Sequence, residues 1–249
     1  MEYFRACRVT AAAATVATVF AASACSGAAG SASSGAATTS DASLSIGIAA
    51  DPGSLDPQSS LNGSNALMRT FAYDTPVMLL NSGQLAPEVL TSWKPTSAGW
   101  ALTVRKGVTC ADGSPMDAQT VAANISYVGN PKNQSPMAGV AIPSGTKATA
   151  DSASSVVTVT LPSASPFFMQ NLAELPLVCA KGLADRKLLA KSTDGSGPYV
   201  LSQAQPGNQY TYTRRKGYTW GPDGARTSAP GLPQKVAREV YAALHRTGD

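Results

Sequence analysis

The sequence predicts a mixed α/β domain of the α+β class, preceded by an export segment. Short stretches with the alternation of strands flank stretches with helical spacing, and no internal repeat is present. The chain has 249 residues, of which 43% are hydrophobic, so it can bury a core. Nineteen Lys and Arg against fifteen Asp and Glu give a net charge of +4, which is spread along the chain and indicates no particular partner.

Residues 1–24 are predicted to be a signal peptide. Arg5 and Arg8 precede an uncharged run rich in Ala, Val and Thr, and small residues stand directly before Cys25. The run is too short for a membrane-spanning helix, which needs about 20 apolar residues. Small residues before a cysteine resemble the bacterial lipobox, although Ala22 stands where that pattern prefers leucine. We therefore expect lipid on Cys25 and an anchor on the outer face of the cell membrane. A soluble secreted protein cut nearby is the alternative.

The segment 25–43 is predicted to be the lipidated cysteine and a flexible linker. Residues 26–43 contain no apolar side chain larger than alanine, so they cannot contribute to a core. As a coil, these residues would span roughly 25 Å. Such a linker would hold the folded part just off a membrane surface.

Two kinds of spacing predict the elements of the folded part, in order along the chain. Alternating apolar residues predict strands at 44–50, 100–104, 154–162, 175–180, 199–204 and 209–215. Helical spacing predicts helices over 65–73, from Asp117 onward and over 166–175. Asp117 is a suitable N-cap, and Val121, Ile125 and Val128 recur on one face of the helix that follows it.

Cys110 and Cys179 are the two cysteines of the predicted folded part, because Cys7 lies in the signal peptide and Cys25 would carry lipid. Two thiols in an oxidising compartment have one intramolecular pairing, so we predict a Cys110–Cys179 disulfide. A Cys-His nucleophile pair or a zinc site lacks partners, since the one histidine is His245, near the chain end. A free, buried thiol at each position is the alternative.

Ser144 and Lys147 form a Ser-x-x-Lys match, the nucleophile pattern of penicillin-binding proteins and β-lactamases. Those enzymes need the serine at the start of a helix and a Ser-Asp-Asn motif. Here Ser144 follows Pro143 in a glycine-containing loop, and Ser-Asp-Asn is absent. An exported serine acyl-enzyme using Ser144 and Lys147 is therefore the alternative function, and the chain is predicted not to be an enzyme.

Aromatic and basic residues alternate in the stretch 210–220, YTYTRRKGYTW. Stacking aromatics with cations are typical of single-strand nucleic-acid binding, but an exported chain rarely meets such a ligand. A strand followed by an aromatic packing corner explains the stretch better. We therefore expect no nucleic-acid partner.

Five short blocks follow one another along the chain: SIGIAADPGSLDP, FAYDTPV, LAPEVLTSW, GWALTVRKGVTCADGSPMDAQTVAANISYV, and GSGPYVL with TRRKGYTWG. In this order they resemble the bacterial extracellular solute-binding proteins of family 5, components of peptide and nickel importers of the ATP-binding cassette (ABC) type. The resemblance runs from about Leu44 to the chain end. Cys110 and Ala111 depart from it, since many members have an aromatic residue and a histidine there. A cysteine at this place with another at Cys179 resembles a subgroup that has a disulfide.

The resemblance implies a lobe of the type II periplasmic-binding-protein kind. Residues 44–249 would form the N-terminal lobe, with an inserted subdomain at about 61–190, and the chain would stop before the second lobe, as a truncated product does. The implied function is capture of a peptide or related small solute outside the membrane for delivery to an ABC permease. A lipid-anchored monomer without cofactor or metal is expected.

The resemblance also implies the ligand-binding residues. Asp51, Pro52, Gly53 and Ser54 fall in the ligand-side loop after the first strand, where backbone groups can pair with an extended peptide as an added strand would. Met137 falls where members often offer a larger side chain to the pocket. An ordinary surface turn is the alternative for all five. The acidic residue that commonly receives a peptide's amino group has no counterpart before the chain end.

Overall fold

The structure is a computed structural model that describes residues 43–221 and the strand 235–240. The predicted signal peptide, Cys25, nearly all of the linker and His245 lie outside the described residues. No described helix has the length and apolar character that a membrane span requires. The domain boundaries and the lipidation at Cys25 therefore stay predictions.

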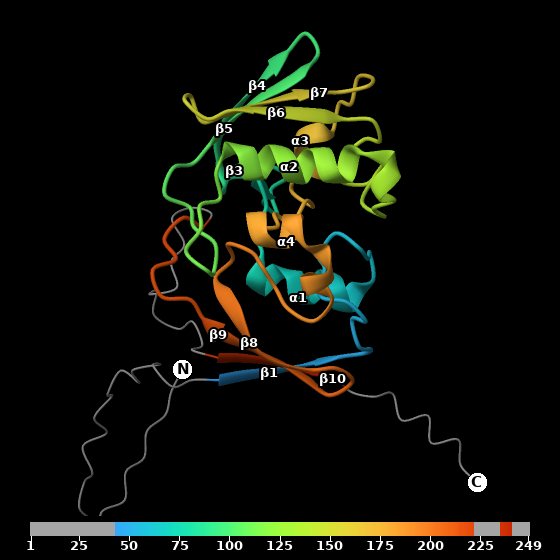
Figure 1. Cartoon of the computed structure of the whole chain (residues 1–249), viewed down its shortest axis with the longest axis vertical. Coiled ribbons are helices and arrows are strands. Elements are labelled where there is room, and N and C mark those ends of the chain that lie inside the picture. The colour runs from blue at the N-terminus through green and yellow to red at the C-terminus, as the bar shows by residue number, and fades with distance from the viewer. Residues whose placement is uncertain (1–42, 222–234, 241–249) are drawn as a thin grey trace, which may run out of the picture. The chain divides into compact units, whose positions relative to one another are not determined.

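The described chain contains short strands and helices in a mixed order (Figure 1). The strands are β1 Ser43–Ile48, β2 Val77–Leu79, β3 Leu85–Pro87, β4 Leu90–Thr96, β5 Gly99–Val104, β6 Lys147–Asp151, β7 Val156–Thr160, β8 Tyr199–Gln205, β9 Gln209–Arg214 and β10 Lys235–Val240. The α-helices are α1 Gly63–Ala72, α2 Ala118–Gly129, α3 Phe168–Leu172 and α4 Ala180–Ala184, and the 3-10 helices are η2 Pro131–Asn133 and η3 Arg186–Ala190. The α+β prediction is confirmed.

One sheet has the strand order β1-β10-β9-β8, and α1 packs against it. β1 is parallel to β10, with Ser43 opposite Lys235, whereas the other neighbours are antiparallel. Figure 1 shows α1 and α4 on one side of this sheet. We call the buried hydrophobic cluster of this part of the protein the α1 core. It contains Ile48, Leu55, Met68, Ala72, Tyr73, Val178, Leu189, Tyr199, Tyr210 and Tyr212.

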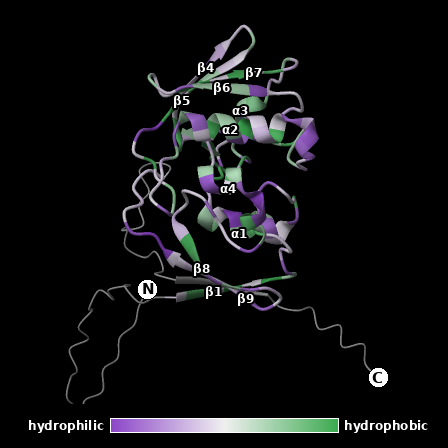
Figure 2. Ribbon diagram, viewed as in Figure 1, coloured by the Kyte–Doolittle hydropathy of each residue, from purple (hydrophilic) through white to green (hydrophobic). Residues whose placement is uncertain are grey.

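A second sheet has the antiparallel order β4-β5-β7-β6 and is covered by α2. Val121, Ile125 and Val128 are fully buried in the cluster that α2 shares with this sheet, which we call the α2 core. Figure 2 shows hydrophobic residues along β7 and on parts of α2. The helix begins where the sequence predicts, because the Asp117 carboxylate accepts a hydrogen bond of 2.9 Å from the Thr120 amide.

The predicted strand at 175–180 is wrong. Val178 makes only an isolated bridge to Gly195, and Cys179 is already the N-cap of α4. The reason lies in Asn124 of α2, whose side chain accepts from the Val178 N–H and donates to the Val178 carbonyl, both at 2.8 Å. A side-chain amide thus satisfies the backbone groups that a strand would have paired with a neighbour.

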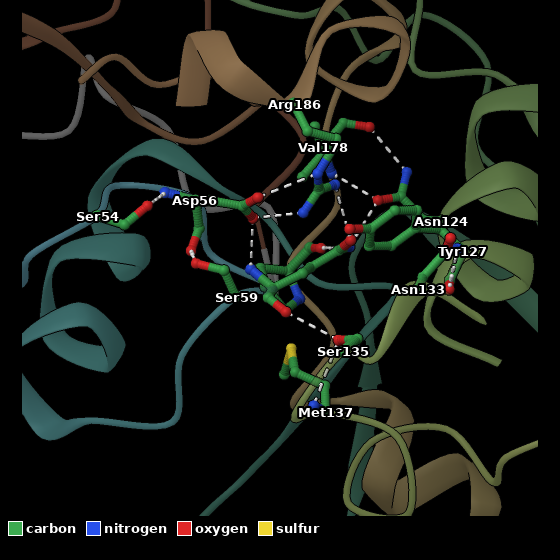
Figure 3. A network of polar contacts seen from close by, with 12 residues as sticks. Ser54, Asp56, Ser59, Asn124, Tyr127, Asn133, Ser135, Met137, Val178 and Arg186 are labelled. Atoms are coloured by element: carbon green, nitrogen blue, oxygen red, sulfur yellow. Dashed lines mark hydrogen bonds and ion pairs between the residues drawn. The ribbon is translucent and has the colours of Figure 1, made fainter. Parts of the chain in front are cut away.

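A buried polar network lies between the α1 core and the α2 core (Figure 3). The Arg186 guanidinium pairs with the Asp56 carboxylate through two hydrogen bonds, and its Nη1 donates to Gln58 Oε1 at 3.0 Å. Gln58 in turn donates to Asn124 Oδ1 at 2.8 Å. The Tyr127 ring covers the guanidinium, 4.1 Å from its central carbon. The network therefore connects the segment after β1 with α2 and η3.

The predicted disulfide is confirmed, since Cys110 and Cys179 are bonded and both are fully buried. Their Cα atoms lie 6.2 Å apart, and 69 positions separate them in the sequence. Cys110 lies at the corner of the Asp-Gly turn, where its amide donates to the Ser114 carbonyl. The bond therefore joins the turn before α2 to the start of α4.

Replacing Cys110 with serine should lower the free energy of unfolding by about 4 kcal/mol, because the unfolded chain gains the entropy of an open loop of this size. Denaturant titration of the purified protein measures the change. Cys179→Ser and the double variant should lose the same amount, since each removes the same bond, and reductant should bring the unmodified protein to their level. Two thiols that react with a labelling reagent in the denatured, unreduced protein would contradict the pairing.

Candidate functional site

The loop predicted to bind ligand, Asp51–Ser54, follows β1 and is held by its own turn. Asp51 Oδ1 accepts a hydrogen bond of 2.7 Å from the Gly53 amide, and Gly53 has a φ of +73°, a conformation that favours glycine. Gly53 is exposed, Asp51 and Ser54 are half-buried, and Pro52 is buried. The four predicted residues therefore share one turn at the end of the strand.

Asp51 also links this loop to the turn between β8 and β9. Its Oδ2 accepts from the Gly207 amide at 2.5 Å and from the Tyr210 hydroxyl at 2.8 Å. Partial burial raises the pKa of Asp51, but the hydrogen bonds from Gly207, Gly53 and Tyr210 outweigh it, so the pKa lies below its ordinary value of 3.8. The carboxylate is thus ionised at neutral pH and satisfied within the protein.

The side chains of Asn62, the N-cap of α1, and of Asn65 in its first turn occupy two further backbone groups of the loop. The Asn62 amide donates to the Pro52 carbonyl at 3.3 Å, and the Asn65 amide donates to the Ser54 carbonyl at 2.8 Å. Ala49 and Ala50, directly before the turn, are exposed. The Pro52 and Ser54 carbonyls are therefore occupied within the protein, whereas Ala49, Ala50 and Gly53 lie at the surface.

A pocket of about 480 Å³ lies beside this loop. It is lined by Gly47, Ile48, Ala49, Ala50, Asp51, Asn62, Gly63, Ser64 and Leu67. The first turn of α1 thus forms one wall, and the first N–H groups of a helix favour electronegative ligand atoms. Most of the lining is backbone or small side chains, a composition suited to binding and without a nucleophile–base pair. In the part of the chain that the structure describes, no group of His, Cys, Asp or Glu is placed to hold a metal ion.

The other residues singled out from the sequence lie away from this pocket. Met137 is fully buried in the α2 core, so its contact with a ligand stays a prediction. Ser144 is exposed in a turn before β6, and Lys147 is the first residue of that strand. A serine in that turn does not have the helix-start position that the acyl-enzyme alternative requires.

Sequence reasoning missed a buried acidic pair, Asp74 and Glu88. Asp74 accepts hydrogen bonds of 2.8 Å from Ser196, Tyr218 and Trp220. Burial raises the pKa of Asp74, although these hydrogen bonds and the nearby Arg215 partly offset the increase. Burial, followed by the charge of Asp74, raises the pKa of Glu88 to about 8. A single acidic residue inside the apolar stretches FAYDTPV and LAPEVL was the signal in the sequence.

Comparison with known proteins identifies the family to which this fold belongs. Residues 84–237 match the bacterial extracellular solute-binding proteins, family 5, over the part named the middle. This match covers more than half of the chain. The chain therefore belongs to family 5 of the bacterial extracellular solute-binding proteins, as the resemblance predicted.

Individual relatives extend the comparison. The chain is 27% identical over 215 residues to the probable D,D-dipeptide-binding periplasmic protein DdpA of Escherichia coli (strain K12). The matched region covers 79% of this chain and 40% of DdpA. A substrate-binding protein of Microbacterium hydrocarbonoxydans, solved with 4-hydroxybenzoate hydrazide, is 28% identical with a TM-score of 0.71, over 81% of this chain and 42% of that one. The Escherichia coli murein tripeptide binding protein MppA is 22% identical with a TM-score of 0.64, over 80% of this chain and 42% of that one. At this identity the likeness establishes a shared fold and nothing further. The chain thus spans about 40% of the length of these relatives.

Replacing Asp51 with alanine should loosen the loop, because three donors lose their shared acceptor. We expect amide hydrogen exchange at Gly53 and Gly207 to rise about fivefold, equivalent to about 1 kcal/mol. Asp151→Ala is the matched control, since Asp151 accepts a similar hydrogen bond from Ala153 in the β6–β7 turn. In the unmodified protein the link should be present above about pH 4 and be lost as the pH falls through the lowered pKa of Asp51. Unchanged exchange at Gly207 would contradict the link.

Replacing Glu88 with glutamine should remove a pH dependence of stability. Because the pKa of Glu88 is raised from 4.5 to about 8, the folded state binds more protons than the unfolded state between these values. The free energy of unfolding should therefore decline as the pH rises from about 4.5 to about 8, and decline less in Glu88→Gln. Urea titrations of both proteins across this range provide the measurement. Parallel curves would show that Glu88 is already ionised in the folded protein.

Proposed function

We propose that the chain serves as a solute-binding part of an ABC importer and captures a peptide or a related small solute outside the membrane. The observation that carries the proposal is the loop Asp51–Ser54 beside the 480 Å³ pocket. The loop offers backbone groups at the end of an edge strand, and an extended ligand can pair with such groups. The chain is not an enzyme on this proposal, and it delivers its ligand to a membrane permease.

The peptide class is supported by the names of the relatives. DdpA is described as a probable D,D-dipeptide-binding protein, and MppA as a murein tripeptide binding protein. The Campylobacter jejuni protein NikZ was solved with Ni(L-His). It shares the fold at 18% identity and a TM-score of 0.65, over 80% of this chain and 39% of that one. A short peptide or an amino-acid-derived solute is therefore the ligand class to test first.

The proposal includes an extracytoplasmic location, with a monomer anchored by lipid on Cys25. The uncharged run before Cys25 and the linker 26–43 support the anchor. Mass spectrometry of the N-terminal peptide from membrane-bound material tests it. An unmodified Cys25, or cleavage at another position, would refute the anchor without affecting the ligand site.

This chain should bind di- and tripeptides only weakly, with a Kd of about a millimolar. The Asp51–Ser54 loop and its pocket contact only one side of a ligand and leave most of the ligand's surface in water. Nuclear magnetic resonance detects such binding directly. Titration with a peptide mixture should shift the amide signals of residues 49–54 and leave those of the β6–β7 turn, residues 152–155, unchanged. Shifts confined to other residues would exclude the loop as the site.

Asp51→Ala provides the second arm of this experiment. We expect the variant to lose the shifts at residues 49–54, since its loop no longer has one conformation, while Asp151→Ala retains them. Tight, saturable binding by the unmodified chain would overturn the view that one face contributes only part of the affinity. Hydrolysis of a β-lactam reporter that Ser144→Ala abolishes would instead establish the acyl-enzyme alternative.

A further inference from the structure

A second pocket, of about 360 Å³, lies between α1, β2 and the residues after α3. One wall comes from α1, where Ala66, Arg69 and Thr70 lie at helical spacing on a single face and Tyr73 is the C-cap. None of its lining residues belongs to the pocket beside the Asp51–Ser54 loop. We call it the Arg69 pocket. It is therefore a separate cavity with its own chemistry.

Arg69 forms the cationic end of this pocket. Its side chain is only 14% exposed, and Nη2 donates to Glu174 Oε2 at 3.1 Å. The Glu174 side chain is 62% exposed, and Nη1 of Arg69 is buried without a hydrogen-bond partner. A buried guanidinium with one unmet donor gains energy from any carboxylate that binds both arms. The exposed Glu174 can move into solvent when such a carboxylate enters.

Glu88 forms the acidic end of the same pocket. It is 5% exposed, and Oε2 accepts both the Thr75 hydroxyl, at 2.5 Å, and the Thr75 amide, at 3.3 Å. No described residue donates to Oε1. Asp74, Tyr218 and Arg105 lie near Glu88, and Arg69, Tyr73 and Glu174 line the same pocket. Arg105 donates to the Glu88 backbone carbonyl rather than to its side chain. No cation therefore pairs with this carboxyl group in the described structure.

An apolar wall lies between these ends. Met78 and Leu79 of β2 line the pocket and are 37% and 46% exposed. Arg69 is paired with Glu174 and not with Glu88, so the cationic and acidic ends do not neutralise each other. A cavity with separate cationic and acidic groups and an apolar wall matches a small molecule that carries both charges and an alkyl group.

We propose that the Arg69 pocket binds a small zwitterion, an amino acid or a dipeptide, as a second ligand site. The ligand carboxylate takes both arms of Arg69 and displaces Glu174. The ligand ammonium donates to Glu88, with Thr75 as a neighbour, and the alkyl side chain lies against Met78 and Leu79. This site does not depend on the proposed function of the Asp51–Ser54 loop, because the two share no residue.

Binding of an ammonium group has a consequence for protons. The raised pKa of Glu88, about 8, keeps this group protonated at neutral pH in the free protein. A ligand ammonium stabilises the carboxylate form, so Glu88 gives up its proton to the buffer as the ligand binds. At pH 7 the balance is therefore close to one proton released for each ligand bound, and no covalent bond is made. A merely structural Glu88 would show no such release.

Calorimetry of the 249-residue protein at pH 7 tests the site with L-alanyl-L-alanine as the probe. We expect binding with proton release, seen as a heat that depends on the ionisation enthalpy of the buffer. N-acetyl-L-alanyl-L-alanine lacks the ammonium and L-alanyl-L-alaninamide lacks the carboxylate, so each should bind about tenfold more weakly. Equal affinity of the three probes, or no binding of the dipeptide, would overturn the proposal.

Variants assign the binding to this pocket. Glu88→Gln should abolish proton release and weaken binding, and Arg69→Lys should weaken binding about tenfold, because a lysine lacks the two-armed geometry. Glu174→Gln alters an exposed residue and should strengthen binding, since the competing carboxylate is removed. Asp151→Ala, which lines neither pocket, should change neither binding nor proton release. Loss of dipeptide binding in Asp51→Ala, with unchanged binding in the three pocket variants, would place the ligand at the loop and refute this second site.

Discussion

The ion pair between Asp56 and Arg186 connects the two parts of the described fold. Burying a charged group costs free energy unless oppositely charged and hydrogen-bonding groups surround it. Here the Arg186 guanidinium donates two hydrogen bonds to the Asp56 carboxylate and one to Gln58, and the Tyr127 ring covers it. Because Asp56 lies two residues after Ser54 and accepts the Gln58 amide, the same pair fixes the end of the candidate loop. The position of the candidate loop thus depends on Arg186 of η3, far away in the sequence.

The local features of the fold could be predicted, since they depend on neighbours in the sequence. Asp117 marks the start of α2 through its own side chain, and the Asp51-Pro52-Gly53 turn needs only its own three residues. The strand at 175–180 could not be predicted correctly, because Asn124 of α2 takes the backbone groups of Val178. The apolar pattern of a segment does not reveal that a side chain, rather than a neighbouring strand, will pair with its backbone groups.

The candidate site divides in the same way. The loop was found through the family's blocks, but the link from Asp51 to Gly207 spans 156 positions and leaves no local trace. Asp74 and Glu88 stand in apolar stretches, where an acid is unusual. Their proximity follows from the pairing of β2 with β3, in which Val77 lies opposite Pro87, and Trp220 donates to Asp74 from a distant part of the sequence. Electrostatic properties that arise from burial therefore require coordinates, whereas turn chemistry does not.

The parallel pairing of β1 with β10 has a consequence for how the chain folds. Ser43 lies opposite Lys235, so the first strand finds its neighbour only after nearly all of the described residues have been made. The sheet β4-β5-β7-β6 and α2, by contrast, draw on residues 90–160 and close much shorter loops. Long loops close slowly because their entropy must be lost first. This sheet and α2 are thus expected to form early. Until β10 is available, the edge of β1 stays exposed to other chains, and a chaperone could bind it during this period.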